Sequence, residues 1–129
     1  MVPAVVVRVH DGPVPAEALP CFQEGAGAAV TFAGLVRPLE GERTILALDY
    51  EVYEPMACRV LEELAREMIK THGLLGIVVE HSRGRVRVGE CSFRLQIAAP
   101  HRQEALAAMV EFIDRMKRDV PIWKHACPL

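Results

Sequence analysis

The sequence has few aromatic residues, no excess of charge of one sign and no long apolar run. Aromatic side chains make up 5% of its 129 residues, so platforms that stack nucleic-acid bases are not expected. Fifteen basic residues against seventeen acidic ones give a net charge of −2, which does not favour binding to nucleic acid or to a membrane surface. No apolar stretch approaches the roughly 20 residues that cross a bilayer, and no signal peptide is recognisable at the N-terminus. We therefore expect a cytoplasmic protein.

The four cysteines form neither a metal-site pattern nor a disulfide pattern. Cys21, Cys58, Cys91 and Cys127 are far apart, without C-x-x-C spacing and without an accompanying histidine cluster. This usage predicts neither a zinc site nor a disulfide framework, and no motif for an organic cofactor is present. We interpret the cysteines as small core residues, with Cys127, in the tail near Lys124, as the exception.

The pattern of apolar residues predicts a single α+β domain over residues 1–129. Its hydrophobic content of 51% suffices for one core. Alternation and β-branched runs predict strands over 4–9, 28–36, 46–52, 77–80 and 91–98, with Leu46, Leu48, Tyr50 and Val52 on the buried face of the third. Helices are expected over 15–23, 55–72 and 101–119, and a polar loop over 37–43. The helices should cover one face of a largely antiparallel or mixed sheet.

Three arginines alternate in the segment 83–90, which we predict to be a short strand flanked by turns. Arg83, Arg85 and Arg87 would share one face of it. A solvated edge strand is the favoured interpretation, because charged edges prevent unwanted strand pairing.

The last helix carries a lysine on its predicted apolar stripe. Leu106, Met109, Val110, Ile113 and Val120 fall on one side of this helix, and Lys117, four residues past Ile113, points into the same arc, as does Arg102. Both cations could simply bury their stems and reach water near the helix ends. However, Pro121 ends the helix and an extended Ile122–His125 segment then presents Lys124 and His125. A partly desolvated lysine beside a second cation can act as nucleophile or general base.

A second cluster of candidate residues precedes the same helix. His101 and Arg102 stand at its start, where backbone amides can receive a phosphate or carboxylate; Arg37, in the loop after the second strand, is a further anion-binding candidate. Arg102 and Lys117 are fifteen residues apart, which in a straight helix is roughly 22 Å. One small ligand cannot span that distance. We expect either two separate sites or, as the favoured hypothesis, a site shared across a two-fold dimer.

Several segments together resemble the large, catalytic subunit of molybdopterin synthase. They follow one another in order over nearly the whole chain: Gly27–Arg37, Leu48–Tyr53 with Met56, His81–Gly84 with Val88–Glu90, Ala99–Arg102 and Met116–Lys124. The resemblance implies the family's α/β hammerhead fold with an additional small antiparallel β-sheet. It departs from the family at Lys124-His125-Ala126, where Lys-Arg-Glu is common, and at Leu35, where a lysine is common. The family's longer C-terminal segment has no counterpart after Leu129.

The resemblance also implies a reaction and partners. The family places two sulfurs on cyclic pyranopterin monophosphate, giving the dithiolene of molybdopterin in molybdenum cofactor biosynthesis. The sulfur arrives as a thiocarboxylate on the C-terminus of a small ubiquitin-like subunit. Two large subunits form a homodimer and each carries one small subunit, which gives a heterotetramer.

Residue roles follow from the family's motifs in the same way. Lys117 would be the general acid-base or electrostatic catalyst, and Lys124 would assist it and bind substrate. Arg37 would hold substrate together with His101 and Arg102 of the neighbouring chain, and His125 would replace an arginine contact. Phe32 and Met116 would be supporting wall residues.

Two alternatives stay open at this point. A non-catalytic α+β module could bind an anionic metabolite through Arg37, His101 and Arg102, in which case loss of Lys117 would leave affinity intact. A sulfurtransferase could instead carry a persulfide on Cys127. We rank the second lower because nothing evident in the sequence orders the tail.

Overall fold

The structure of the protein, a computed structural model, describes residues 3–21 and 23–129. Its elements follow the order β1 (Val5–Asp11), β2 (Ala28–Leu35), β3 (Leu39–Glu40), β4 (Arg43–Val52), α1 (Met56–His72), β5 (Gly76–Arg87), β6 (Cys91–Ala99), α2 (Arg102–Asp119) and β7 (Ile122–Pro128). The predicted strands and the two long helices are confirmed. The extended segment predicted at 122–125 is part of a longer strand, β7, which continues to Pro128.

The strands form one mixed sheet in which β5 belongs to two parts. The order is β2-β6-β5-β4-β3, with β1 beside β5 and β7 beside β4. The first half of β5 pairs with β6 and, in parallel, with β1. Residues 84–87 of β5 pair instead with β4, which pairs with β7 on its other side, both antiparallel. The α+β class and the additional small antiparallel sheet are therefore as expected.

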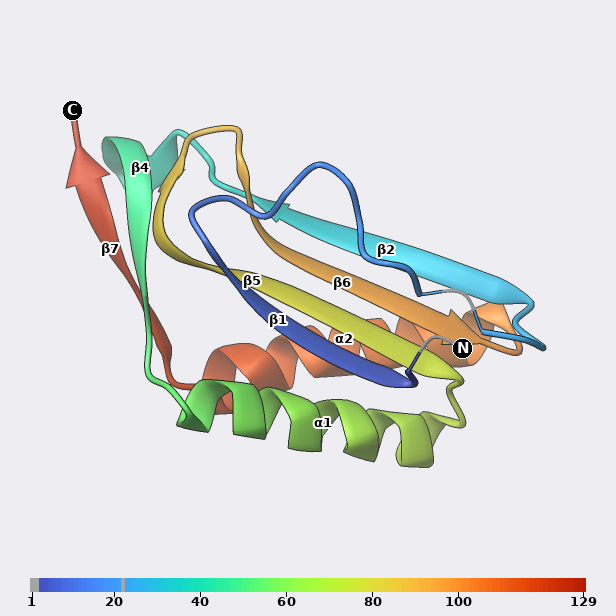
Figure 1. Ribbon diagram of the computed structural model, residues 1–129. Coiled ribbons are helices and arrows are strands. Elements are labelled where there is room, and N and C mark those ends of the chain that lie inside the picture. The colour runs from blue at the N-terminus through green and yellow to red at the C-terminus, as the bar shows by residue number, and fades with distance from the viewer. Residues whose placement is uncertain (1–2, 22) are drawn as a thin grey trace.

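Both helices lie on one face of the sheet, as predicted (Figure 1). The core fills the space between this face and the helices. Its largest fully buried apolar side chains are Phe112, Leu61, Met68, Ile77, Leu95 and Ile97. This arrangement follows from amphipathic helices, which must bury their apolar stripe against another layer. Neither of the two helices in the described part of the chain is long and apolar enough to cross a membrane.

Helix α1 ends where the sequence predicts. Gly73 has φ 68° and ψ 43°, the left-handed conformation that glycine adopts without a steric penalty. The N–H of the following Leu74 bonds to the carbonyl of Ile69 at 3.0 Å and closes the helix. The chain then enters β5, which lies at the centre of the sheet.

The predicted buried face of β4 is wrong at its start. Leu46 is 55% exposed, whereas Ala47 is 2% exposed. The pairing of β4 with β7 shifts register between Ile45 and Ala47, and such a bulge adds a residue that reverses which side chains point inward. Simple alternation from Val52 back to Leu46 therefore assigns Leu46 to the wrong face.

The predicted helix over 15–23 is absent from the described residues of that range, and residue 22 lies outside them. The backbone carbonyls of this segment accept hydrogen bonds from β6 side chains instead. Arg94 donates to the carbonyls of Pro15 and Glu17, at 2.8 and 3.2 Å, and Gln96 donates to that of Leu19 at 2.8 Å. Pro20 also lacks an N–H for a helical bond. These bonds attach the segment to the sheet.

The arginine-rich segment is not a separate short strand but the second half of β5. Its three arginines are exposed, as expected. Arg83 forms an ion pair with Asp11 at 2.8 Å and Arg85 forms one with Asp49 at 2.9 Å. Because both pairs are largely solvated, they contribute little to stability.

Candidate active site

A pocket of about 630 Å³ opens where the C-terminal end of α2 meets the sheet and β7. The sheet supplies one wall through β2, β5 and β6, and the small sheet supplies another through β4 and β7. Its lining residues are Phe32, Ala33, Gly34, Leu35, Val36, Arg37, Glu40, Leu48, Tyr50, His81, Ser92, Phe93, Ile113, Met116, Lys117, Val120, Ile122, Trp123 and Lys124. The volume suits a small organic ligand.

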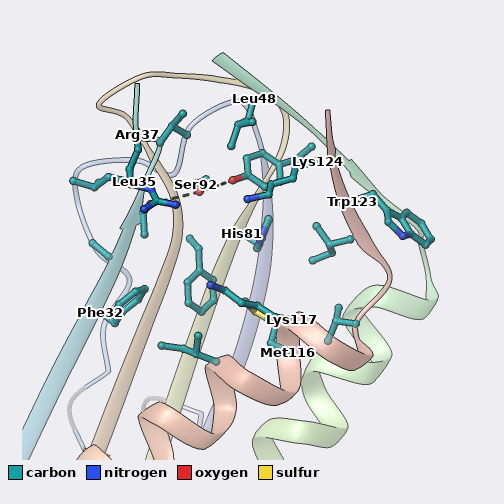
Figure 2. Close-up of a pocket in the computed structure, with 18 of the residues that line it drawn as sticks. Phe32, Leu35, Arg37, Leu48, His81, Ser92, Met116, Lys117, Trp123 and Lys124 are labelled. Carbon is teal, nitrogen blue, oxygen red and sulfur yellow. Dashed lines mark hydrogen bonds between the residues drawn. The ribbon is translucent and has the colours of Figure 1, made fainter. Parts of the chain in front are cut away.

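Three cations predicted from the sequence meet in this pocket. Arg37 follows β2, Lys117 lies in the last turn of α2, and Lys124 lies on β7. Figure 2 shows their side chains reaching into the same space from three sides. The sequence contains three lysines, and two of them line this pocket, whereas Lys70 lies on α1. Segments far apart in sequence thus bring the positive charge together.

The positive charge of the pocket is only partly neutralised. Glu40 is the one carboxylate among the lining residues, and its Oε1 lies 3.0 Å from Lys124 Nζ. Within the described residues, neither Lys117 nor Arg37 forms an ion pair. Three cations therefore face one carboxylate, an arrangement that favours the binding of anions.

The supporting residues also lie where the sequence places them. Met116 is 7% exposed and Phe32 is 40% exposed, and both line the pocket. The Phe32 ring packs against Phe93 with centroids 6.0 Å apart. Together they give the pocket an apolar wall below its charged rim.

The floor of the pocket contains a polar chain that sequence reasoning did not single out. The hydroxyl of Tyr50 donates to Ser92 Oγ at 3.1 Å, and Ser92 Oγ donates to the carbonyl of Gly34 at 3.5 Å. The edge of the Tyr50 ring meets His81, with centroids 5.1 Å apart. A signal was present, because the polar residues Glu80, His81 and Ser82 directly follow the apolar run 77–79 of β5, but no local pattern shows that β4 and β6 place partners beside them.

His81 is neutral at this position. Its side chain is 5% exposed, and burial lowers its pKa, although the hydrogen bond from Nδ1 to the Ser82 carbonyl, at 2.8 Å, acts in the opposite direction. Desolvation disfavours the charged imidazolium more than one carbonyl contact favours it. The pocket therefore has an uncharged imidazole among its cations.

The predicted apolar stripe of α2 is partly wrong. Leu106 and Val110 are 51% and 63% exposed, while the residues that face the core are Ala105, Ala108, Met109, Phe112 and Met116. Small alanines mark the buried face because the helix packs closely on the sheet. Lys117 therefore lies beside the core face, exposed to the pocket, and the prediction that it shares a buried face with Arg102 is wrong because both side chains are exposed.

His101 and Arg102 lie at the opposite end of α2 from Lys117, as the helix length predicts. The side chain of His101 is 79% exposed and its Nδ1 lies 3.3 Å from Glu104 Oε2. Neither residue lines the pocket of its own chain. His125 does not line it either; its Nε2 lies 4.0 Å from Glu51 Oε2.

Cys127 is ordered by β7, contrary to our expectation for the tail. It pairs with Ala47 in the register of β4 and β7, and its thiol donates to Asp49 Oδ2 at 3.3 Å. The bond to the Asp49 carboxylate raises the pKa of this thiol. Cys127 is also absent from the pocket lining. In the part of the chain that the structure describes, no group of three or more His, Cys, Asp or Glu residues could hold a metal ion.

Comparison with known sequences gives a consistent result. The family model described as MoaE protein matches residues 10–119. The chain is 41% identical over 100 residues to the molybdopterin synthase catalytic subunit of Coccidioides immitis, covering 78% of this chain and 51% of that protein. It is 40% identical over 99 residues to the subunit of the same name from Nostoc sp., covering 76% and 60%. The chain thus spans about half the length of these curated relatives.

Solved structures share the fold. The molybdopterin synthase from Staphylococcus aureus superposes with a TM-score of 0.85 at 28% identity, covering 94% of this chain and 90% of that chain. A complex of subunits 1 and 2 of molybdopterin-converting factor from Helicobacter pylori contains a chain that superposes with a TM-score of 0.75 at 24% identity, covering 93% and 83%.

Proposed function

The chain belongs to the MoaE protein family, and from that premise we propose that it is the catalytic subunit of a molybdopterin synthase. It transfers two sulfurs from the thiocarboxylated C-terminus of a small ubiquitin-like subunit to cyclic pyranopterin monophosphate. The product is the dithiolene of molybdopterin. The single observation that carries this proposal is the pocket in which Arg37, Lys117 and Lys124 meet with one carboxylate among them.

The reaction requires two anions to approach each other. At about 4 Å, two unit charges of the same sign repel by about 4 kcal/mol at an effective dielectric constant of about 20. A pocket with an excess of two positive charges, three cations against Glu40, offsets this repulsion before the reaction begins. Preorganised charge of this kind stabilises the transition state without reorganisation.

The roles of the pocket cations follow from where they point. Lys117, which has no partner among the described residues, extends into the pocket from the last turn of α2 and acts on the thiocarboxylate and the reacting pterin carbons as general acid-base or electrostatic catalyst. Arg37 and Lys124 hold the anionic groups of the substrate. Phe32 and Met116 form the apolar wall. His125 is not among the lining residues, so we assign it no role in this site.

A second copy of the chain completes the site. His101 and Arg102 of that copy supply further substrate contacts, since in their own chain they lie at the far end of α2. An exposed apolar surface is available for the contact: Leu106 and Val110 on α2 are half exposed or more, as is Leu35 at the end of the edge strand β2. Two copies, each with one small subunit, would form the heterotetramer.

Reconstitution tests the activity. The purified chain is mixed with a thiocarboxylated small subunit and the pyranopterin substrate, and dithiolene product is measured. We expect product with the wild-type chain, a loss of about 10²- to 10³-fold with Lys117→Ala, and wild-type rates with Lys70→Ala, the matched lysine outside the pocket. Absence of product with the wild-type chain would refute the proposed activity.

Mixed dimers test the shared site. A Lys117→Ala chain and an Arg102→Ala chain, each nearly inactive alone, should recover part of the activity when mixed, because one of the two sites in a mixed dimer then has both residues. A mixture that stays as inactive as its components would contradict a site built from two chains.

A binding module for an anionic metabolite is the competing function. It shares the pocket and its cations, but it predicts no sulfurated product and unchanged affinity in Lys117→Ala. The same reconstitution therefore separates the two functions. We favour the enzyme because Arg37 and Lys124 would suffice to bind an anion. The third cation, Lys117, has no partner in the described part of the chain and is available for catalysis.

A further inference from the structure

His81 is buried on the floor of the pocket, yet the proposed sulfur transfer has so far given it no role. Its ring lies between Tyr50 and Phe93, with centroids 5.1 and 5.9 Å away. These contacts fix its position on the central strand β5. Figure 2 shows it behind the space into which Lys117 and Lys124 reach.

The hydrogen bond of His81 defines its tautomer. Nδ1 lies 2.8 Å from the carbonyl oxygen of Ser82, and because a carbonyl only accepts, Nδ1 carries the proton. Burial lowers the pKa of the ring, so it is neutral. The lone pair is therefore on Nε2.

The lone pair of Nε2 faces the pocket. No hydrogen bond occupies it among the described residues, and the only enclosed side-chain polar atom without a partner in that part of the chain is Ser82 Oγ. Nε2 is therefore not enclosed, and the open space beside this ring is the pocket that His81 lines.

The other titratable groups that line the pocket are unsuited to accept a proton. Arg37 does not give up its proton, and the proposed function uses Lys117 and Lys124 as ammonium groups, which attract the anions or donate a proton and have no lone pair in that form. Glu40 is engaged by Lys124 at 3.0 Å, and the Tyr50 hydroxyl donates to Ser92. These groups come from the segment after β2 and from α2, β7, β3 and β4. Among the described titratable residues that line the pocket, His81 on β5 is therefore the one that can accept a proton.

The proposed reaction needs a base at one particular stage. The thiocarboxylate is already an anionic nucleophile, so no proton has to be removed from it. Its sulfur bonds to an electrophilic pterin carbon while a bond from that carbon to oxygen breaks, and the electron pair of the broken bond moves onto the oxygen, which takes up a proton. This bond makes a thioester that joins the small subunit to the pterin. For sulfur to stay with the pterin, the bond between the acyl carbon and sulfur must break, and a water molecule must supply the oxygen of the released carboxylate.

We propose that Nε2 of His81 is the general base that activates the water for hydrolysis of this thioester, an inference that rests on the proposed function. The water oxygen bonds to the acyl carbon while Nε2 takes one of its protons. The bond between carbon and sulfur breaks, and its electron pair leaves with the pterin as a thiolate beside the Lys117 ammonium. The carboxylic acid formed loses its proton to solvent, and the imidazolium returns its proton to solvent or to the thiolate.

Single-turnover reactions with His81→Asn test this step. The asparagine amide can still donate to the Ser82 carbonyl but offers no basic nitrogen. Loss of a general base costs about 10²- to 10⁴-fold, so we expect thioester hydrolysis to slow by at least about 10²-fold. A covalent adduct of small subunit and pterin should then accumulate and be visible by intact-protein mass spectrometry. The matched control His72→Asn, which changes a histidine paired with Glu111 outside the pocket, should behave as wild type.

Two readouts separate this role from a structural one. Because burial lowers the pKa of His81 below the ordinary histidine value of about 6.5, the wild-type hydrolysis rate should stay unchanged near that pH and fall only at lower pH, where the base becomes protonated. This dependence should be absent in His81→Asn and in His81→Gln. In water enriched in ¹⁸O, one labelled oxygen should enter the released carboxylate of the small subunit in the wild-type reaction.

The outcomes are distinguishable from failure of the proposed function. If the wild-type chain gives dithiolene, but His81→Asn turns over at the wild-type rate without adduct, or no ¹⁸O enters the carboxylate, the role of His81 is refuted while the activity stands. If His81→Asn and His81→Gln both fail to fold, a wild-type hydrolysis rate that shows no fall even well below pH about 6.5 would refute it as well. If the wild-type chain gives no dithiolene, the proposed function itself fails.

Discussion

The charged side chains buried in the sheet and those in the pocket are neutralised to different degrees. In the sheet, Glu80 and Arg94 are 1% and 7% exposed, and their ion pair is 2.8 Å long. His10 adds a contact of 3.0 Å to the same Glu80. In the pocket, Lys117 is exposed and has no partner within the described residues.

The difference separates charges that maintain the fold from charges that await a ligand. A buried charge without a partner carries a large desolvation cost, so a buried pair must be complete within the chain. Arg94 additionally donates hydrogen bonds to the carbonyls of Pro15 and Glu17, which attaches residues 15–17 to the sheet. A cation at the edge of a pocket keeps its hydration when the pocket is empty and can exchange water for an anion.

The largest expected effect is a loss of stability when the buried ion pair of Glu80 and Arg94 is broken. Glu80→Gln leaves the Arg94 guanidinium buried opposite a neutral amide, and breaking a buried pair from one side costs about 3–5 kcal/mol. Urea-induced unfolding should show this loss of stability. Asp11→Asn, which breaks the solvated pair with Arg83, is the matched control and should cost less than about 1 kcal/mol. Equal losses in the two variants would remove the distinction between the regions.

Lys117→Arg tests whether the pocket needs only the charge of Lys117 or also its ability to transfer a proton. The positive charge remains, but the compact ammonium group is replaced by a planar guanidinium that does not transfer protons. We expect kcat to fall about 10²-fold, with KM changed by less than about 3-fold and the free energy of unfolding within about 0.5 kcal/mol of wild type. Steady-state kinetics of the reconstituted enzyme measure this split; retention of kcat would show that charge alone suffices.

A smaller effect is expected where the pocket is already neutralised. Glu40 holds Lys124 at 3.0 Å and so competes with an incoming anion. Glu40→Gln should tighten binding of the pyranopterin phosphate about 2- to 5-fold, which corresponds to the modest strength of a half-exposed ion pair. Calorimetric titration measures it, with Glu42→Gln in the same loop as control. Weaker binding would mean that Glu40 contacts the ligand itself and does not compete with it for Lys124.

The smallest effect is expected at Cys127. The Cys127 thiol donates a hydrogen bond to the Asp49 carboxylate at 3.3 Å, and this bond raises the pKa of the thiol. The nucleophilic thiolate is therefore less populated at neutral pH than in an isolated cysteine. Cys127→Ser should leave dithiolene formation unchanged within about 2-fold. A persulfide carrier at this position would instead lose all activity in the same assay.

Much of the fold was predictable because its signals are local. The β-branched run of β1 and the glycine after α1 specify their elements without reference to the rest of the chain. The errors arose where distant residues decide. Residues 15–19 are attached to β6 by hydrogen bonds from Arg94 and Gln96 rather than held in a helix, and the face of Leu46 depends on a bulge against β7.

The site was predictable to the extent that charge marks it. Lys117, Lys124 and Arg37 stood out as cations near apolar segments or breaks, and the resemblance supplied their roles. Lys117 lines the pocket, although the apolar stripe on which we predicted it includes the exposed Leu106 and Val110. His81 was missed because its properties depend on contacts from Tyr50 and Phe93, which no spacing along the sequence reveals.

The most direct test of the account is the affinity of the pocket for the anionic pterin. Titration of pyranopterin phosphate into the wild-type chain, at increasing salt, should give a Kd that rises steeply with ionic strength. Lys117→Ala/Lys124→Ala should raise Kd by at least about 10²-fold, since each charged hydrogen bond contributes about 1.5–3 kcal/mol, while Lys70→Ala should not change it. Equal Kd values for all three proteins, insensitive to salt, would contradict a pocket whose cations serve to bind anions.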